Sequence, residues 1–456
     1  MRLWQMEPLP PAAIAGLTPS GVEIVFYDDR MEPVDFDAPV DLAAISVETY
    51  TAKRAYQIAS EFRRRGVPVV MGGFHAALCP QEVARYADAV VIGEAEGLWE
   101  QVLADAERGA LATYYQSAAR PPLAGLRPDR SIYAGKNYLP VGLVEFSRGC
   151  HYRCDFCAIQ TVFHRSQNCR PPEDILAELE TQRRKPLVFF VDDNLTASPD
   201  RARQLLEALI PLKMRWVSQV SLEAALDEDL LALMARSGCQ GVLIGFESLN
   251  PANLEKMNKR VNLSRGEPAY EQALANLRRH NIRLYITFVF GYNADTPDSF
   301  GDSLDFAMRQ RFYIAAFNHL TPFPGTPLYH RLQAEGRLRF DAWWLDEGYS
   351  YNQLPFYPVS MTPEAVQRGC VETRAQFYSW PNIWRRGLDP VNRSSLPMWL
   401  HYYGINAMFR REVRSRDDFP LGDQDWQGEL LPVRLDPPGP TLLNSAASAL
   451  LQRQDS

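Results

Sequence analysis

The sequence predicts an α/β protein in three parts: an open parallel sheet, then a partial (β/α)6 barrel of the TIM type, then a mainly helical extension. Three observations carry this prediction. Short apolar runs alternate with helical patterns over most of the chain, a proline-rich stretch at 118–130 interrupts them, and the alternation ends near residue 340, where aromatic residues become frequent. We therefore expect units at 1–115 and 140–338, joined by a linker at 116–139 and followed by an extension and tail at 339–456.

The first unit contains five short apolar runs with helical patterns between them. The runs lie at 2–6, 23–28, 42–47, 68–73 and 89–94. They are rich in β-branched residues and scarcely alternate with polar ones, which predicts parallel strands covered by helices on both faces. Ligands dock over the carboxyl ends of such strands, here the turns at 48–51, 72–75 and 93–96.

After the linker, six β/α units follow one another, as in most of a TIM-type barrel. Their strands are expected at 142–146, 187–193, 215–221, 241–248, 283–292 and 312–325. The chemistry of such barrels lies at the carboxyl ends of the strands. A loop with three cysteines directly follows the first strand and so occupies such a position.

Composition argues against several classes of protein. The chain has 456 residues with 46% apolar content, enough for two or three domains. Its 48 Lys and Arg are dispersed among 55 Asp and Glu, so we expect no nucleic-acid partner. No stretch approaches the roughly 20 apolar residues that span a bilayer, and the amino end lacks a signal-peptide pattern, so we expect no membrane partner and a cytoplasmic location. Seven cysteines in a reducing compartment argue against a disulfide framework.

The most informative stretch is SRGCHYRCDFCAIQ, which places Cys150, Cys154 and Cys157 within eight residues. The spacing could arise by chance, or could hold a structural zinc ion if Cys169 or a nearby histidine supplied a fourth ligand. Closed zinc sites usually use a second pair of ligands, however, and no second cysteine pair is present. Clustered thiolates are the normal ligands of iron–sulfur clusters, and a [4Fe-4S] cube held by three of them leaves one iron open to substrate. We favour the cluster.

The Cys-x3-Cys-x2-Cys spacing, with Phe156 before the last cysteine, resembles the signature of the radical S-adenosylmethionine (SAM) superfamily. The resemblance implies that the amino and carboxylate groups of SAM bind the open iron, and that Phe156 lies against the adenine. It also implies an external one-electron reductant of the flavodoxin or ferredoxin type, so that the reduced cluster can cleave a carbon–sulfur bond of SAM. It assigns no catalytic residue beyond these cofactor contacts.

The same resemblance assigns SAM contacts to the ends of later strands. Asp192 and Asp193 in FFVDDN are candidates for the amino group, although this pair could instead cap the helix that begins near residue 199. Glu247 in IGFES is expected near the ribose or the methionyl part, and a buried glutamate satisfied by backbone donors is the alternative. The third strand, WVSQVS, offers Gln219 and two serines, of which Gln219 is our candidate.

The order of the units, with segments such as GGFHAALCPQEV, LIGFES and TPFPGTP, resembles the cobalamin-binding-domain class of this superfamily. In that class the first unit is a flavodoxin- or Rossmann-like domain of the cobalamin (B12)-binding type. Two features depart from the pattern: no Asp-x-His-x-x-Gly motif is present, and MRLWQMEPLPP is short for the strand and loop that cradle the cofactor. Whether the chain binds cobalamin is therefore left open. We expect His75 to be a surface histidine or a substitute contact for cobalamin.

These features predict an enzyme that cleaves SAM reductively at a [4Fe-4S] cluster and transfers a SAM-derived group or radical to a small molecule in biosynthesis. Three alternatives remain: a cobalamin-dependent methyltransferase, transfer of a 3-amino-3-carboxypropyl group from SAM to trivalent arsenic as in arsinothricin biosynthesis, and a non-enzymatic iron–sulfur redox sensor. The arsenic alternative uses the remaining cysteines as soft ligands. These are Cys79, Cys169, Cys239 and Cys370, of which Cys239 lies in an apolar segment and is expected in the core.

The extension begins with an aromatic segment that contains Trp343, Trp344, Tyr349 and Tyr351. These side chains could cover the barrel mouth and exclude water, or could form the small core of the last part of the chain. We favour the core. The sequence does not indicate the substrate, the bond of SAM that breaks or the oligomeric state.

Overall fold

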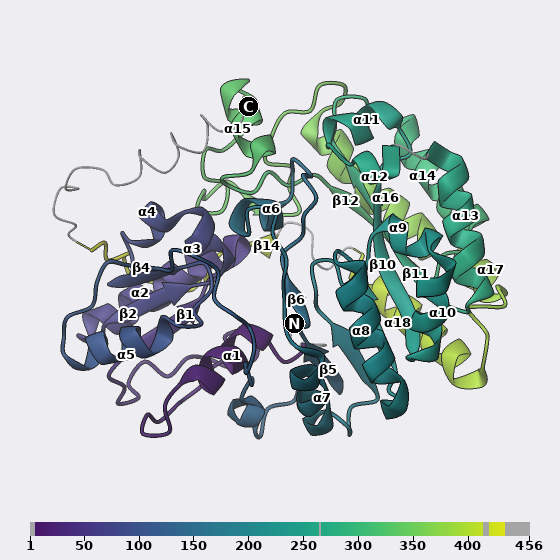
Figure 1. Ribbon diagram of the computed structural model, residues 1–456. Helices are drawn as coiled ribbons and strands as arrows, with labels where there is room; N and C mark the ends of the chain where they lie inside the picture. The colour runs from purple at the N-terminus through teal and green to yellow at the C-terminus, as the bar shows by residue number, and fades with distance from the viewer. Residues whose placement is uncertain (1–4, 264–265, 414–418, 434–456) are drawn as a thin grey trace, which may run out of the picture.

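The computed structural model describes residues 5–263, 266–413 and 419–433. Two α/β units lie side by side in Figure 1, the first in purple and blue and the second in teal and green. Each is built on a parallel sheet, and the helical extension packs behind the second. The predicted α/β fold is confirmed at this level.

The first sheet has four parallel strands in chain order: β1 (Ala43–Ser46), β2 (Val69–Gly72), β3 (Ala89–Ile92) and β4 (Tyr114–Gln116). The helices around it are α1 (Leu9–Leu17), α2 (Ala52–Arg64), α3 (Phe74–Leu78), α4 (Pro80–Val83) and α5 (Trp99–Glu107). Val69 and Met71 belong to one buried apolar cluster, whereas Val70, between them, belongs to another. Both faces of the sheet are therefore covered, which explains why its strands scarcely alternate with polar residues.

One expected strand is absent, another lies mostly outside the described residues, and one strand was missed. Residues 23–28 have no strand structure, and neither do residues 5 and 6, while 2–4 lie outside the described residues. Val22, Ile24 and Val25 are 43%, 40% and 53% exposed, so the apolar run at 22–25 neither pairs nor enters the core. β-propensity produces a strand only where a neighbouring strand offers free backbone groups. The missed strand, β4, is only three residues long, with Tyr115 as its one buried side chain.

The second sheet forms the partial barrel, with six parallel strands in the order β12-β11-β10-β9-β8-β5. Their bounds are β5 (Val141–Val144), β8 (Leu187–Phe190), β9 (Trp216–Gln219), β10 (Cys239–Glu247), β11 (Arg283–Phe290) and β12 (Ile314–His319). The main outer helices are α7 (Pro172–Thr181), α8 (Pro199–Leu209), α10 (Glu228–Arg236), α13 (Gly266–Arg279) and α14 (Asp298–Arg309). Phe246 stacks on Tyr270 of α13 with ring centroids 4.2 Å apart, so this side chain faces the helices. Alternate residues of the strands therefore face the barrel interior.

The last part of the chain contains α15 (Pro327–Ala334), β13 (Ser350–Tyr351), α16 (Pro363–Phe377), α17 (Trp380–Gly387), α18 (Leu396–Glu412) and β14 (Phe419–Pro420). Trp343, Trp344 and Tyr349 are buried in the same apolar cluster as β1 and β2, and Tyr351 packs against it. These aromatic residues are core residues, but the expectation that they form a separate core of the last part of the chain is wrong, because they join the extension to the core of the first unit.

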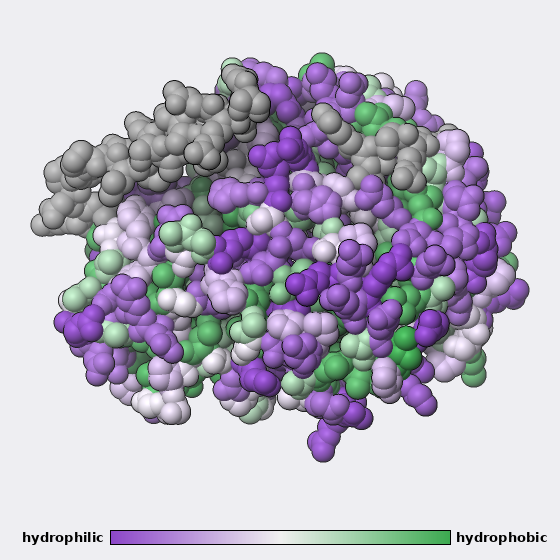
Figure 2. Space-filling model, viewed as in Figure 1, coloured by the Kyte–Doolittle hydropathy of each residue, from purple (hydrophilic) through white to green (hydrophobic). Residues whose placement is uncertain are grey.

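No helix among the described residues combines the length and apolarity that crossing a bilayer demands. Hydrophilic side chains cover most of the face seen in Figure 2, over both units.

Candidate active site

The carboxyl ends of the two sheets approach each other. The hydroxyl of Tyr50, just after β1, lies 3.2 Å from the hydroxyl of Thr321, just after β12. Glu96, after β3, forms an ion pair of 2.8 Å with Arg148 of the cysteine loop. Ligands of parallel sheets bind at these ends. The two expected ligand-binding edges are thus parts of one region.

The cysteine loop is held in place by glycine geometry and by a buried carboxylate. Gly149 has φ +92°, and a Cβ there would come within 2.1 Å of the carbonyl oxygen of Ser166, so only glycine fits. Asp155, between the last two cysteines, accepts hydrogen bonds from the Tyr292 hydroxyl at 2.5 Å and the Arg331 guanidinium at 2.7 Å. The loop is thereby fastened to the end of β11 and to α15.

The thiols of Cys150, Cys154 and Cys157 are partly buried and interact electrostatically with one another. Burial raises the pKa of all three, that of Cys157 to about 12, and the neighbouring Cys154 adds to this effect. Without a metal they are neutral thiols, and metal coordination would deprotonate them. The donor set fits an iron–sulfur cluster.

The spread of the three sulfurs bears on the zinc alternative. Thiolates on one zinc ion at about 2.3 Å lie less than about 4 Å apart. Within the described part of the chain, only His75, Cys79 and Glu82 bring three metal-ligand atoms within 4.8 Å of one another. The three loop thiols do not form such a group in the structure.

Lys259 is a site residue that the sequence did not reveal. Its ammonium donates to Glu247 at 2.5 Å, and Glu247 holds a left-handed φ of +63° at the end of β10. Burial would lower the pKa of Lys259, but the charges of Glu247 and Cys154 outweigh it and raise that pKa. A Cβ on Gly245 would collide with this ion pair, at 2.0 Å from the Glu247 carboxylate. A cation is thus fixed beside the cysteine loop, and Glu247 is satisfied by a lysine and not by backbone donors.

Asp192 and Asp193 both accept hydrogen bonds from the cysteine loop. Asp192 accepts from the backbone N–H groups of Phe146 and Ser147, at 3.1 and 2.6 Å, and from the Ser147 hydroxyl. Asp193 accepts from the Gly149 N–H at 2.7 Å. Burial raises both pKa values, that of Asp192 to about 7, against the opposing effect of these bonds. Neither caps the helix α8, whose N-cap residue is Ser198, so that alternative is wrong.

Gln219 and Phe156 occupy different environments. Gln219 is the exposed last residue of β9, whereas Ser218 is buried and donates to the carbonyl of Phe190. By strand alternation Gln219 faces the opposite side from Ser218. Phe156 is partly buried against the barrel core. The structure thus leaves Gln219, on β9, as the accessible polar side chain of that strand.

A buried charge network joins the cysteine loop to the first unit. Arg148 pairs with Glu145 at 2.6 Å and with Glu96, while Arg120 pairs with Glu94 at 2.6 Å. Burial raises the pKa of Glu145, and Arg148 opposes that effect. Removing one partner of such a buried pair usually costs more stability than its presence adds. The network fixes the first unit against Arg148, which lies two positions before Cys150.

Of the remaining candidates, only Cys169 lies beside the cysteine loop. His75 is fully buried between Thr49 and Glu82, so the expectation of a surface histidine is wrong. Cys239 and Cys370 are buried in the main core. Cys169 pairs with Ser147 in a short antiparallel ladder beside the loop.

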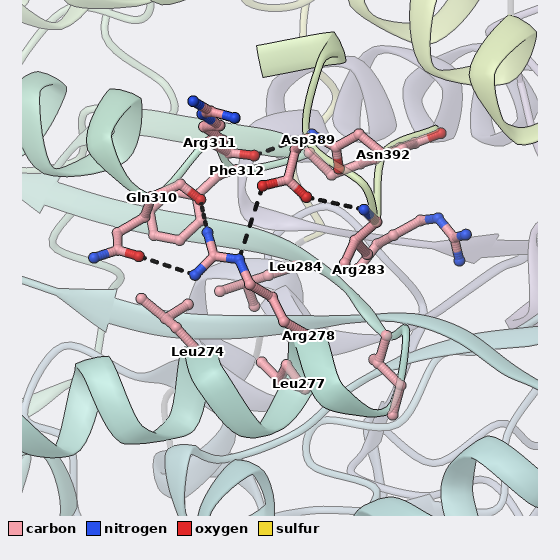
Figure 3. Close-up of a pocket in the computed structure, with 13 residues that line it drawn as sticks. Leu274, Leu277, Arg278, Arg283, Leu284, Gln310, Arg311, Phe312, Asp389 and Asn392 are labelled. Carbon is pink, nitrogen blue, oxygen red and sulfur yellow. Dashed lines mark hydrogen bonds and ion pairs between the residues drawn. The ribbon is translucent and has the colours of Figure 1, made fainter. Parts of the chain in front are cut away.

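A small cavity of about 30 Å³ lies at the opposite end of the barrel, around the starts of β11 and β12 (Figure 3). It has room for about one water molecule. Arg278 at its edge donates to the Gln310 side chain at 3.1 Å, as Figure 3 shows. In barrels of this kind the amino end serves stability. This cavity is therefore not the candidate active site.

Comparison with known proteins agrees with this geometry. The family model of the radical SAM superfamily matches residues 144–307. Bacteriochlorophyllide d C-12(1)-methyltransferase of Chlorobaculum tepidum is 30% identical over 392 residues, which cover 83% of this chain and 84% of that protein. The C-8(2)-methyltransferase of the same organism is 26% identical, over 82% of this chain and 86% of that protein.

Two solved structures share the fold across both units. TsrM from Kitasatospora setae, a radical SAM methyltransferase with cobalamin and a [4Fe-4S] cluster bound, has a TM-score of 0.60 at 16% identity, covering 83% of this chain and 90% of that one. OxsB, a cobalamin-dependent SAM radical enzyme, has a TM-score of 0.55 at 15% identity, covering 83% and 64%.

A barrel with three clustered thiols at its carboxyl rim defines an enzyme of the iron–sulfur and SAM type. The chain belongs to the radical SAM superfamily. It is a radical SAM enzyme, whose cofactors are a [4Fe-4S] cluster and SAM, as the sequence predicted.

Proposed function

We propose that this protein is a cobalamin-dependent radical SAM methyltransferase that acts on a small molecule, with the cobalamin in the first unit (1–115) and the cluster in the barrel (140–338). The observation that carries the proposal is the approach of the two carboxyl edges, joined by the Glu96–Arg148 pair two residues before Cys150. A ligand of the first sheet would face the barrel cofactors. The two bacteriochlorophyllide relatives are methyltransferases, and the structures of TsrM and OxsB, which share the fold, contain cobalamin.

In this proposal Cys150, Cys154 and Cys157 bind the cluster. The cluster would supply one electron, and SAM would supply a methyl group or a radical. Lys259 places a positive charge beside these thiolates, which favours their charged form, and its ammonium keeps further donors for the SAM carboxylate after bonding Glu247. Asp193 and Gln219 are then the polar groups left for the rest of SAM, and Phe156 is the apolar contact for its adenine.

Asp192 has a supporting role in this site and no direct one. Three loop donors already occupy its carboxylate, so it orients the segment that leads to Cys150. The substrate would approach along the barrel interior, where Gln219 and Asn318 are the exposed polar residues at the ends of β9 and β12.

Part of the rim of the first sheet is accessible. Ser46 and Glu48 at the end of β1 are exposed, and a Cβ on Gly93, which has φ +86°, would meet no other atom within 4 Å. In the proposal, the cofactor would contact these residues.

The arsenic alternative has less support from the structure. Two of its four cysteines, Cys239 and Cys370, are 5% and 1% exposed within the core. Cys79 lies beside His75 in the first unit, which leaves Cys169 as a single thiol near the loop. A lone thiol is a weak site for trivalent arsenic, which binds two or three sulfurs.

The decisive experiment is anaerobic reconstitution of the full chain with iron, sulfide and cobalamin, followed by SAM and a strong reductant. We expect about one cobalt per chain and S-adenosylhomocysteine among the products, because loss of a methyl group from SAM leaves that compound. Absence of bound cobalt with methylthioadenosine as product would support aminocarboxypropyl transfer. Failure to consume SAM would support a redox sensor. In the cell we place the enzyme in the cytoplasm with a flavodoxin- or ferredoxin-type reductant and no nucleic-acid or membrane partner.

A further inference from the structure

A second group of metal-ligand side chains lies outside the barrel rim, in the first unit. A ring nitrogen of His75, the sulfur of Cys79 and a carboxylate oxygen of Glu82 all lie within 4.8 Å of one another. His75 and Cys79 are four residues apart on α3 and its end, and Glu82 follows on α4. The short turn at Cys79–Pro80 therefore brings one nitrogen, one sulfur and one oxygen to a common point.

Hydrogen bonds explain part of this arrangement but not the sulfur. His75 Nε2 lies 3.1 Å from Glu82 Oε1, and the Tyr56 hydroxyl donates to the same oxygen at 2.8 Å. The hydrogen bonds of the described residues include none to the Cys79 sulfur, although this sulfur lies within 4.8 Å of ligand atoms of both His75 and Glu82. The soft sulfur of Cys79 thus lies beside a His75–Glu82 pair whose own hydrogen bonds are satisfied.

The surrounding bonds resemble those that orient metal ligands. The other ring nitrogen of His75 lies 3.3 Å from the Thr49 hydroxyl, and the Trp344 indole N–H donates to both Glu82 oxygens at 3.0 and 3.1 Å. In metal sites the second nitrogen of a ligating histidine is usually hydrogen-bonded, and so is a ligating carboxylate. A divalent ion would also neutralise the charges of a thiolate and a carboxylate at this largely buried place.

We propose that His75, Cys79 and Glu82 form a second metal site, which binds one zinc ion at the junction between the first unit and the C-terminal extension. Zinc suits a mixed nitrogen, sulfur and oxygen set, and three protein ligands leave a fourth position for water. His75 is fully buried, whereas Cys79 and Glu82 are partly exposed and provide the entry side. Because Trp344 of the extension bonds Glu82, the ion fixes the carboxylate on which the extension docks.

The test is zinc stoichiometry on the full chain with its iron–sulfur cluster assembled, so that the three loop cysteines are occupied. After incubation with zinc and desalting, we expect about one zinc per chain in the parent and in Cys169→Ala, which removes a thiol outside the triad. Cys79→Ala and Glu82→Gln should each lose this zinc. Trp344→Phe, which removes one bond to Glu82, should weaken zinc binding by about 10-fold, at the low end for lost supporting bonds.

A second set of measurements uses the chain without its cluster cysteines, so that the cluster cannot affect zinc binding. In the chain with Cys150, Cys154 and Cys157 all changed to Ala, cobalt(II) should give a sulfur-to-metal charge-transfer absorption that Cys79→Ala abolishes, and zinc should raise the melting temperature only when Cys79 is present. Equal zinc in the parent and in Cys79→Ala, or zinc in neither, overturns the proposal. The result is independent of methyl transfer, because it requires no turnover.

Discussion

The two rims that face each other differ in how their side chains are held. On the barrel rim, buried carboxylates hold the cysteine loop: Asp192 accepts three loop donors, and Asp155 binds Tyr292 and Arg331. On the sheet rim, Glu96 and Tyr50 bond the barrel, whereas Ser46, Glu48 and Gly93 are exposed. The barrel rim is therefore preorganised for cofactors of fixed geometry, whereas part of the sheet rim stays accessible to a ligand.

The largest expected effect is on the barrel rim. Cys154→Ala removes one of three cluster ligands, and no other cysteine on the loop can replace it. We expect loss of most of the bound iron and a drop in SAM cleavage by more than about 100-fold. The three cysteines act as a unit, so removing one abolishes the function of all three. Iron content and the amounts of 5′-deoxyadenosine and S-adenosylhomocysteine formed measure this. Cys169→Ala is the control, with near-parent iron; full iron in Cys154→Ala would refute the assignment.

A smaller loss is expected from the cation beside the cluster loop. Lys259→Gln leaves Glu247 buried without its charge partner and removes donors from the SAM site. We expect SAM affinity to fall about 10- to 100-fold, as for a lost charge-assisted hydrogen bond, with iron content retained. Equilibrium binding of SAM to reconstituted protein is the measurement. Lys256→Gln changes an exposed lysine on the preceding helix and should bind SAM like the parent. Equal affinities in the two variants would remove Lys259 from the site.

The next prediction separates the two rims. Glu96→Gln deletes one of the ion pairs that join the sheet rim to Arg148, while Arg148 keeps Glu145. We expect SAM binding to change little and the rate of group transfer to fall by roughly 3- to 10-fold, which is about 1 kcal/mol in activation free energy. The reason is that only the position of one rim relative to the other is disturbed. The ratio of transferred product to SAM consumed is the readout. Glu100→Gln, exposed on α5, is the matched control. A parallel fall in SAM binding would show that Glu96 instead supports the loop itself.

The sequence predicted what depends on local pattern. The cysteine spacing and the acidic pair after β8 are each contained in a few consecutive residues, and the barrel follows from the alternation of apolar runs with helices. Each of these features can be recognised without knowing what lies opposite in space.

The sequence did not predict what depends on distant partners. Lys259 lies 12 positions beyond Glu247 and had no motif of its own, and the burial of His75 results from Glu82 and from Trp344, far along the chain. The prediction of a strand at 23–28 was wrong for the same reason. A strand needs a neighbouring strand with free backbone groups, and local composition does not reveal one. Contacts between units were therefore the part of the site that only the structure supplied.

The last prediction concerns the charge of Asp192 on the barrel rim and leaves activity aside. Burial raises the pKa of Asp192 to about 7, despite its bonds to Ser147 and Phe146, from an ordinary value of 3.8. Between about pH 4 and pH 7 the folded chain therefore holds a proton that the unfolded chain has released. The free energy of unfolding falls as pH rises through this window, by up to about 1.4 kcal/mol per unit for one proton, and this contribution is constant above it.

Asp192→Asn keeps an oxygen for the loop donors but cannot titrate. The free energy of unfolding of the cluster-free variant should therefore decline less between pH 5 and pH 7 than that of the parent, as measured by urea unfolding midpoints at both pH values. Asp200→Asn, at an exposed position on α8, should retain the parent slope. If Asp192→Asn and the parent lose stability equally over this range, Asp192 is ionised throughout, and the barrel rim then holds a permanent negative charge beside the loop that leads to Cys150.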